Sequence, residues 1–283
     1  MIICEQGIRY RASLPAAMVK AFSCNSLKSL KNTWQNTPPS WGNGDPCGTP
    51  WEGVTCKNSR VTALIPAGCG FTGSIPDELG NLAELSFLAL HKNNLTGKIP
   101  SSLAKLSNFY WLDLADNHLT GPIRVSTPTT PGLDLLRKAK HLLFDGNLLD
   151  GTIPSTLGLV QTLEEFSNNK LKGPLPDLTG MNALNYENLS NKAFFPSEAP
   201  AWFSTLPSLT TLILKNNAFS GQLDMGESVG PLLQLVDLQN NNISSEIQGA
   251  LHSQMLVIVN NSTPAASLAN LSKSPRWKAR TVR

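Results

Sequence analysis

Leucine recurs at a fixed spacing through the middle of this 283-residue chain. The clearest unit, LSFLALHKNNLTGKIPSSLAKLSN, begins at Leu85, and FYWLDLADNHLTGPI begins 24 residues later at Phe109. Together the two units define the template LxxLxLxxNxLxGxIPxxLxxL. A period of this length predicts short coils that stack side by side, because a single coil cannot bury its own leucines.

Each position of the template predicts a local structure. The LxL segment predicts a short strand whose two leucines point to the same face. The asparagine follows the strand, and its amide both donates and accepts, so we expect it to satisfy backbone groups of the turn and of the neighbouring coil. The glycine allows a backbone conformation that other residues resist. The proline after isoleucine predicts an extended, non-helical outer wall.

The repeat becomes irregular in the middle of the chain and then partly recovers. The asparagine position of the template falls at Cys69, Asn93, Asn117, Asn147, Asn169, Lys192, Asn217, Asn241 and Asn260. Successive positions are separated by 24, 24, 30, 22, 23, 25, 24 and 19 residues. The short unit QTLEEFSNNKLKG suggests two coils joined at residues 164–166, and HLLFDGN and LTTLILKNNAF are candidates for similar junctions.

Composition narrows the class of protein. The chain is 41% hydrophobic and 15% charged, which is typical of a folded protein. A net charge of +3 is too small to favour nucleic acid as a partner. The longest apolar run, residues 255–259, has the length of a strand, so we expect no membrane span in this chain.

Five cysteines are present, and two of them lie close together in DPCGTPWEGVTC. This short, tryptophan-flanked spacing predicts a disulfide between Cys47 and Cys56, and with it an oxidising compartment. Half of a zinc site is the alternative, but no second cysteine pair and no spaced histidine pair follows. The pairing of Cys4, Cys24 and Cys69 stays open.

Several segments resemble a known family. WGNGDPCGTPWEGVTCKNSRVTAL is similar to the N-terminal cap of plant leucine-rich-repeat receptor-like kinases, and LTGKIP and FTGSIP are similar to their plant-specific repeat. VSTPTTPGLDLLRKAK, PDLTGMNALNY and PSEAPAWFSTLPSLTTL resemble the ectodomain of the subfamily usually numbered eight. The resemblance implies an α/β-type repeat solenoid: a curved leucine-rich-repeat stack with a parallel β-sheet on the concave face and an N-terminal helical cap.

The expected organisation has four parts. Residues 1–24 form an atypical N-terminal segment and a weak signal-peptide candidate, and residues 25–60 form the cap. Residues 61–262 form the solenoid with irregular repeats, and residues 263–283 form a disordered basic tail. The membrane span, the kinase domain and the cysteine-bearing C-terminal cap of the family have no counterpart here, which suggests a truncated ectodomain whose final coil frays.

No arrangement of residues favours catalysis. The glycine-rich loop, strand lysine, HRD and DFG motifs of a kinase do not occur. The four histidines, at positions 91, 118, 141 and 252, lack metal-ligand spacing and a neighbouring nucleophile. We therefore expect no enzyme activity, no metal site and no cofactor.

Candidate ligand-binding residues flank the inward leucines of the sheet. Phe87 and Trp111 occupy equivalent positions on adjacent coils, and exposed aromatic side chains grouped in this way favour a binding patch. The alternative is an aromatic ladder that only covers the surface of the sheet. The full set of candidates is Phe87, Ala89, His91, Tyr110, Trp111, Asp113, Asp116, His141, Asp145 and Glu165.

The resemblance implies a non-catalytic recognition module in transmembrane signalling, which binds a peptide, a protein or a cell-wall ligand and pairs with a co-receptor leucine-rich-repeat protein. A free secreted inhibitor or defence protein and a degenerate gene product are the alternatives. An extracellular or plasma-membrane outer-face location follows for the parent architecture. Acceptor triplets for N-glycosylation occur at Asn94, Asn188, Asn242, Asn260, Asn261 and Asn270.

Overall fold

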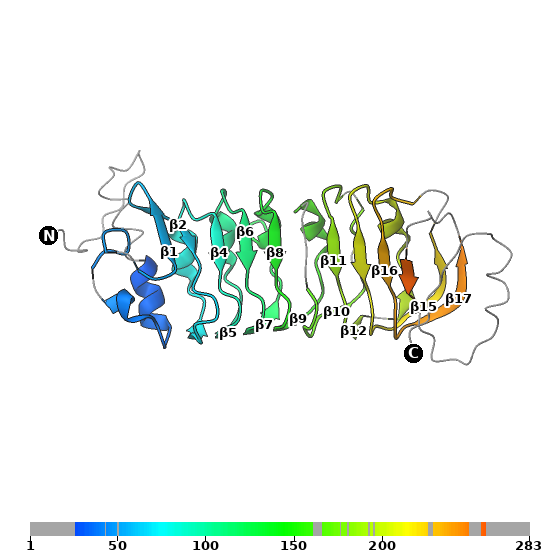
Figure 1. The fold of residues 1–283 in the computed structure, drawn as a ribbon, viewed down its shortest axis with the longest axis horizontal. Helices are drawn as coiled ribbons and strands as arrows, with labels where there is room; N and C mark the ends of the chain where they lie inside the picture. The colour runs from blue at the N-terminus through cyan, green and yellow to red at the C-terminus, as the bar shows by residue number, and fades with distance from the viewer. Residues whose placement is uncertain are drawn as a thin grey trace. The chain divides into compact units, whose positions relative to one another are not determined.

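The computed structural model describes residues 26–42, 44–49, 51–160, 166–175, 177–179, 181–191, 193–194, 196–225, 229–248 and 256–258. The chain divides into two compact units, Met1–His141 (unit 1) and Leu142–Arg283 (unit 2). Each unit is built from stacked coils with short parallel strands (Figure 1). The boundary between the units falls inside HLLFDGN, one of the irregular segments of the repeat.

A helical cap opens unit 1, as the sequence predicts. Residues 26–33 are helical and η1 (Pro39–Gly42) follows. Trp34, Trp41, Trp51 and Phe71 pack in one aromatic cluster with ring centroids 5.1–6.1 Å apart. The Trp34 indole donates to the carbonyl of Ser74 at 2.8 Å, so the cluster fastens the cap to the first coil.

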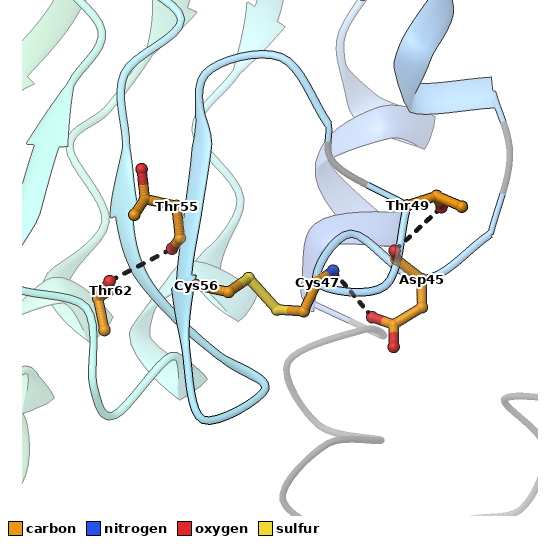
Figure 2. Close-up of a disulfide and its surroundings, with 6 residues drawn as sticks. All are labelled: Asp45, Cys47, Thr49, Thr55, Cys56 and Thr62. Atoms are coloured by element: carbon orange, nitrogen blue, oxygen red, sulfur yellow. Dashed lines mark hydrogen bonds between the residues drawn. A yellow bond between two sulfur atoms is a disulfide. The ribbon is translucent and has the colours of Figure 1, made fainter.

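The predicted disulfide between Cys47 and Cys56 is present (Figure 2). The two Cα atoms lie 5.6 Å apart, inside the usual range for this bond. The Asp45 carboxylate accepts from the Cys47 amide at 3.0 Å and holds the turn before the bridge. The bond joins the cap loop to β1 (Val54–Lys57), which pairs antiparallel with β2 (Arg60–Leu64). Cys69 carries a free thiol.

Unit 1 then continues as parallel coils. On one side β2 pairs with β4 (Phe87–Ala89), and β4 pairs with β6 (Trp111–Asp113). On another side β3 (Thr72–Ser74), β5 (Asn94–Gly97) and β7 (His118–Pro122) form a second parallel ladder. The inward leucines, among them Leu88, Leu90, Leu112 and Leu114, are fully buried between the ladders. The first residue of β8 (His141–Leu143) ends the unit.

Unit 2 repeats the same plan with less regular coils. One sheet of unit 2, the front sheet, contains four parallel strands in the order β11 (Tyr186–Asn188), β14 (Thr211–Ile213), β16 (Leu235–Asp237) and β18 (Leu256–Ile258). A second ladder joins β13 (Ser197–Glu198), β15 (Phe219–Asp224) and β17 (Asn242–Gln248), and β10 (Lys172–Gly173) pairs with β12 (Ala193–Phe194). The unit also contains β9 (Leu148–Asp150).

The expectation of an entirely extended outer wall is wrong. Pro76, Pro100, Pro154 and Pro200 are extended themselves, but a turn of 3-10 helix follows each of them. These turns are η2 (Asp77–Asn81), η3 (Ser101–Lys105), η5 (Ser155–Leu159) and η6 (Ala201–Thr205); η4 (Leu133–Leu135) begins after Gly132 instead. Proline fits the position before a helical turn, because the first amides of a helix have no internal acceptor.

The asparagine of the template has the structural role predicted for it. In Asn117 the amide oxygen accepts from the Leu95 amide at 3.0 Å, while the amide nitrogen donates to the carbonyls of Leu90, Leu114 and Ala115 at 3.0–3.1 Å. Asn93, Asn169 and Asn241 repeat this arrangement, each joining its own turn to the preceding coil. The template glycine also behaves as expected: Gly97 has φ +79°.

The structure describes two of the irregular segments of the sequence. Part of the long spacing before Asn147 is a loop from Arg124 to Gly132, closed by a bond from the Leu133 amide to the Arg124 carbonyl at 2.9 Å. LTTLILKNNAF forms β14 and a regular turn in which Asn217 donates to Leu189, Leu214 and Lys215. A junction of two coils at this segment stays a prediction from the sequence. Residues 161–165, Lys192 and the expected tail lie outside the described residues.

Candidate functional site

Three rings from adjacent coils form a row on the sheet of unit 1. Phe87 on β4 stacks on Trp111 on β6, with centroids 5.1 Å apart and ring planes 13° from parallel. Trp111 contacts the ring of His141 at 4.0 Å on the next coil. All three side chains are half-buried. Strand register places them in line, because Phe87 lies opposite Trp111 in the ladder, so the aromatic row predicted from the sequence exists and extends to His141.

Tyr110 and Ile65 add exposed surface beside the aromatic row. Tyr110 precedes β6, is 49% exposed, and meets His141 edge to face at 6.0 Å. Ile65 follows β2 and is 43% exposed. Sequence reasoning missed Ile65, although it stands four residues before Cys69, as Ala89 stands four residues before Asn93. The signal was therefore available in the register of the first coil.

A carboxylate at the end of β6, that of Asp113, lies close to the imidazole of His91, two residues after the end of β4. Oδ2 of Asp113 is 2.8 Å from Nδ1 of His91, which makes an ion pair when the imidazole is protonated, without the alignment of a directed hydrogen bond. Burial raises the pKa of Asp113 above its usual value, and the negative charge of Asp116 raises it further. The hydrogen bond from the Ala115 amide and the nearby His91 act in the opposite direction and lower this pKa. The exposed Asp116 completes this group.

Not every candidate residue belongs to this surface. The expectation that Ala89 faces solvent is wrong: it is 2% exposed, so its side chain has no surface to offer a ligand. A small side chain between larger neighbours on a sheet is easily covered, and the alternation rule gives direction without giving exposure. Asp145 is half-buried and lies in unit 2, outside the aromatic row. Glu165 lies outside the described residues.

The described acceptor triplets lie on strands. Asn94 begins β5 and Asn242 begins β17, and both side chains are exposed. Asn188 ends β11 and is half-buried. Asn260, Asn261 and Asn270 lie outside the described residues.

The fold defines a class of protein, and the comparisons with known proteins agree with it. A model of the Leucine Rich Repeat family matches residues 84–106, the coil that carries β4 and β5. The chain has the fold of a leucine-rich-repeat solenoid. None of the helices in the described part of the chain has the length and apolar character needed to cross a membrane.

Its homologues are leucine-rich-repeat receptor-like kinases and receptor-like proteins of Arabidopsis thaliana. A probable leucine-rich repeat receptor-like protein kinase is 41% identical over 69 residues, covering 24% of this chain and 7% of the relative. Receptor-like protein 35 is 34% identical over 200 residues, covering 68% of this chain and 17% of the relative. The chain thus spans only a small part of these relatives.

Several structural neighbours are plant leucine-rich-repeat receptor ectodomains. The ectodomain of the Arabidopsis receptor kinase HAESA, solved in complex with an IDA peptide hormone, superposes with a TM-score of 0.68 at 26% identity. The match covers 85% of this chain and 41% of that one. The plant peptide hormone receptor RGFR1, in complex with RGF2, matches with a TM-score of 0.53 at 28% identity, over 68% of this chain and 34% of that one.

Proposed function

We propose that the chain is an extracellular, non-catalytic recognition module and that the aromatic row of unit 1 contacts its ligand. The observation that supports this is the row itself: Phe87, Trp111 and His141 are held in register and remain half-buried on the sheet surface. Aromatic side chains at such positions supply a large share of binding free energy in known interfaces. The disulfide is consistent with an oxidising, extracellular compartment.

The geometry of the rings favours a peptide segment over a polysaccharide. A sugar ring packs its C–H face on an open aromatic face, but Trp111 has Phe87 on one side and His141 at 4.0 Å. The stack therefore presents ring edges, which carry partial positive charge, together with the Trp111 indole N–H and the Tyr110 hydroxyl. Within the described part of the chain, the indole N–H of the Trp111 side chain has no hydrogen-bond partner. Carbonyl oxygens of an extended peptide match these donors.

The structural neighbours support the same ligand class, since HAESA and RGFR1 are each in complex with a peptide. A cell-wall ligand, and a co-receptor leucine-rich-repeat protein as a second partner, remain predictions from the sequence.

The test is a binding screen with the secreted, disulfide-bonded chain. Short synthetic peptides and an array of cell-wall oligosaccharides serve as the two sets of probes. For a peptide that binds, we expect Trp111→Ala to weaken the affinity by about tenfold or more, the effect typical of a hot spot. Leu235→Ala is the matched control, because Leu235 is half-buried at the equivalent position of β16.

Calorimetric melting of both variants separates lost binding from lost folding. Binding to oligosaccharides alone would contradict the peptide assignment. Equal affinities for wild type and Trp111→Ala would remove the aromatic row from the binding surface.

A further inference from the structure

The acceptor triplets for N-glycosylation differ in whether the folded coil leaves them accessible. Asn94 and Thr96 are two residues apart on β5, so their side chains share the outer face of the strand while Leu95 points into the core. Both side chains are exposed. The side-chain amide of Asn94 has no hydrogen-bond partner in the described part of the chain, and its ladder neighbour on β3 is the small Thr72.

The triplet at Asn188 is less accessible, because it is partly buried and hydrogen-bonded. Its hydroxyl residue, Ser190, is 2% exposed. The Asn188 amide oxygen accepts both the Ser190 amide at 3.1 Å and the Ser190 hydroxyl at 2.7 Å. The strand β11 ends at Asn188, and these two bonds hold the triplet against the coil. An oligosaccharide on Asn188 would stand on the front sheet beside β14 and would compete with this turn.

We propose that Asn94 carries an N-linked glycan in the secreted protein and that Asn188 does not. The transfer joins the Asn94 amide nitrogen to C1 of an oligosaccharide carried on a lipid diphosphate. The bond between C1 and the diphosphate oxygen breaks, the lipid diphosphate leaves, and the amide nitrogen loses one proton. This reaction precedes folding, so a glycan must be compatible with the folded coil. A chain that carries a glycan at a position which the folded coil cannot accommodate does not fold and is not secreted.

The position of Asn94 is compatible with ligand binding at the aromatic row. Asn94 belongs to the ladder β3–β5–β7, whereas Phe87 and Trp111 belong to the sheet β2–β4–β6. A glycan on β5 thus starts from a different sheet of the same unit. The inference rests on the extracellular location proposed above and on the accessibility of the two triplets, and it does not depend on the proposed ligand.

The experiment is a site map of the full chain secreted from mammalian cells behind a heterologous leader. Enzymatic release of glycans in ¹⁸O water converts each modified asparagine to a mass-labelled aspartate. The expected result is the label at Asn94 and unlabelled Asn188. An unlabelled Asn94, or a labelled Asn188, in the secreted protein overturns the proposal.

Variants give an independent reading by gel mobility. Asn94→Gln and Thr96→Ala each lose one glycan, whereas Thr96→Ser keeps the triplet and the glycan. Ser190→Ala removes the second triplet and leaves the mobility unchanged. If Asn94→Gln fails to be secreted, the wild-type map still decides the question.

Discussion

The two units meet the same backbone requirement with different side chains. In each described coil, the residue just before the template asparagine position adopts a left-handed conformation. Unit 1 uses Gly68, Lys92 and Asp116 there, with φ +56° at Lys92 and +52° at Asp116. In unit 2 four coils use asparagine: Asn168, Asn191, Asn216 and Asn240, with φ between +52° and +57°. Asparagine tolerates this conformation better than most other residues.

The asparagines of unit 2 also bond to one another. The Asn191 amide donates to Asn168 at 2.7 Å, Asn216 donates to Asn191 at 2.6 Å, and Asn240 donates to Asn216 at 2.6 Å. This exposed chain of amides crosses four coils, and hydrogen bonds in such a chain polarise and strengthen one another. We call it the amide chain.

The sheets of the two units also differ in the side chains that they carry. Unit 1 carries the aromatic row, whereas the equivalent positions of unit 2 hold Tyr186, Thr211 and Leu235, and no ring stack joins them in the described residues. Unit 2 also places Glu187, 1% exposed, where unit 1 has the inward Leu88 and Leu112. The same repeat therefore carries the aromatic row, the proposed ligand surface, in unit 1 and the hydrogen-bonded amide chain in unit 2.

The largest expected effect comes from removing the disulfide, which in the described chain belongs to unit 1 alone. Replacing both Cys47 and Cys56 by alanine should cost about 2–3 kcal/mol, because the bond limits the freedom of the unfolded cap. Hydrogen exchange should show faster exchange in β2 and β4 and unchanged protection in β14 and β16. Equal losses in both units would mean that the cap stabilises the whole chain.

The next effect concerns the template asparagine, which is shared by both units. Asn117→Ala and Asn241→Ala should each destabilise their own unit by about 1–3 kcal/mol, because buried backbone groups lose their partners. The backbone amides of Leu95 and Phe219 donate to these asparagine oxygens, so hydrogen exchange at each amide reports each loss separately. Unchanged protection at both amides would refute the structural role of the residue.

A smaller effect is expected from moving the amide chain into unit 1. The double variant Lys92→Asn and Asp116→Asn should gain about 1 kcal/mol, because lysine is strained in the left-handed conformation. The two amides should also bond as they do in unit 2. The reverse change, Asn216→Lys, should lose a comparable amount. Denaturant titration measures both, and a destabilised double variant would show that the amide chain depends on other features of unit 2.

The smallest effect is a change with pH at Asp113. Because burial raises its pKa, the folded state keeps this proton to a higher pH than the unfolded chain does. The contribution of Asp113 to stability is therefore present below the usual carboxyl pKa of about 3.9 and is lost as pH rises through the folded pKa. Asn does not titrate, so Asp113→Asn should gain stability relative to wild type as pH rises from about 4 toward neutral.

Melting curves across this pH range check the prediction at Asp113. Asp150→Asn, at an exposed position in unit 2, is the control. A constant difference between Asp113→Asn and wild type at every pH would contradict the assignment.

The sequence could have revealed more of the site than it did. Ile65 stands in the same register as Ala89, and consecutive asparagines at 168–169, 216–217 and 240–241 mark the amide chain. What no pattern could give is the exposure of Ala89, because exposure depends on the size of side chains on neighbouring coils. The turn of 3-10 helix after Pro100 differs from the predicted extended wall, because the amide donor that proline lacks is not needed at the start of a helical turn.

The sequence by itself determined the coil, its inward leucines, the asparagine that closes each turn, and the disulfide of the cap. These features depend on contacts within one coil or between adjacent coils, and the repeat brings them together at a fixed spacing. Only the tertiary structure decided the stacking of Trp111 between Phe87 and His141, the pairing of His91 with Asp113, and the difference between Asn94 and Asn188. Each of these depends on how a side chain turns and on what lies beside it across the coil spacing, which a linear pattern does not record.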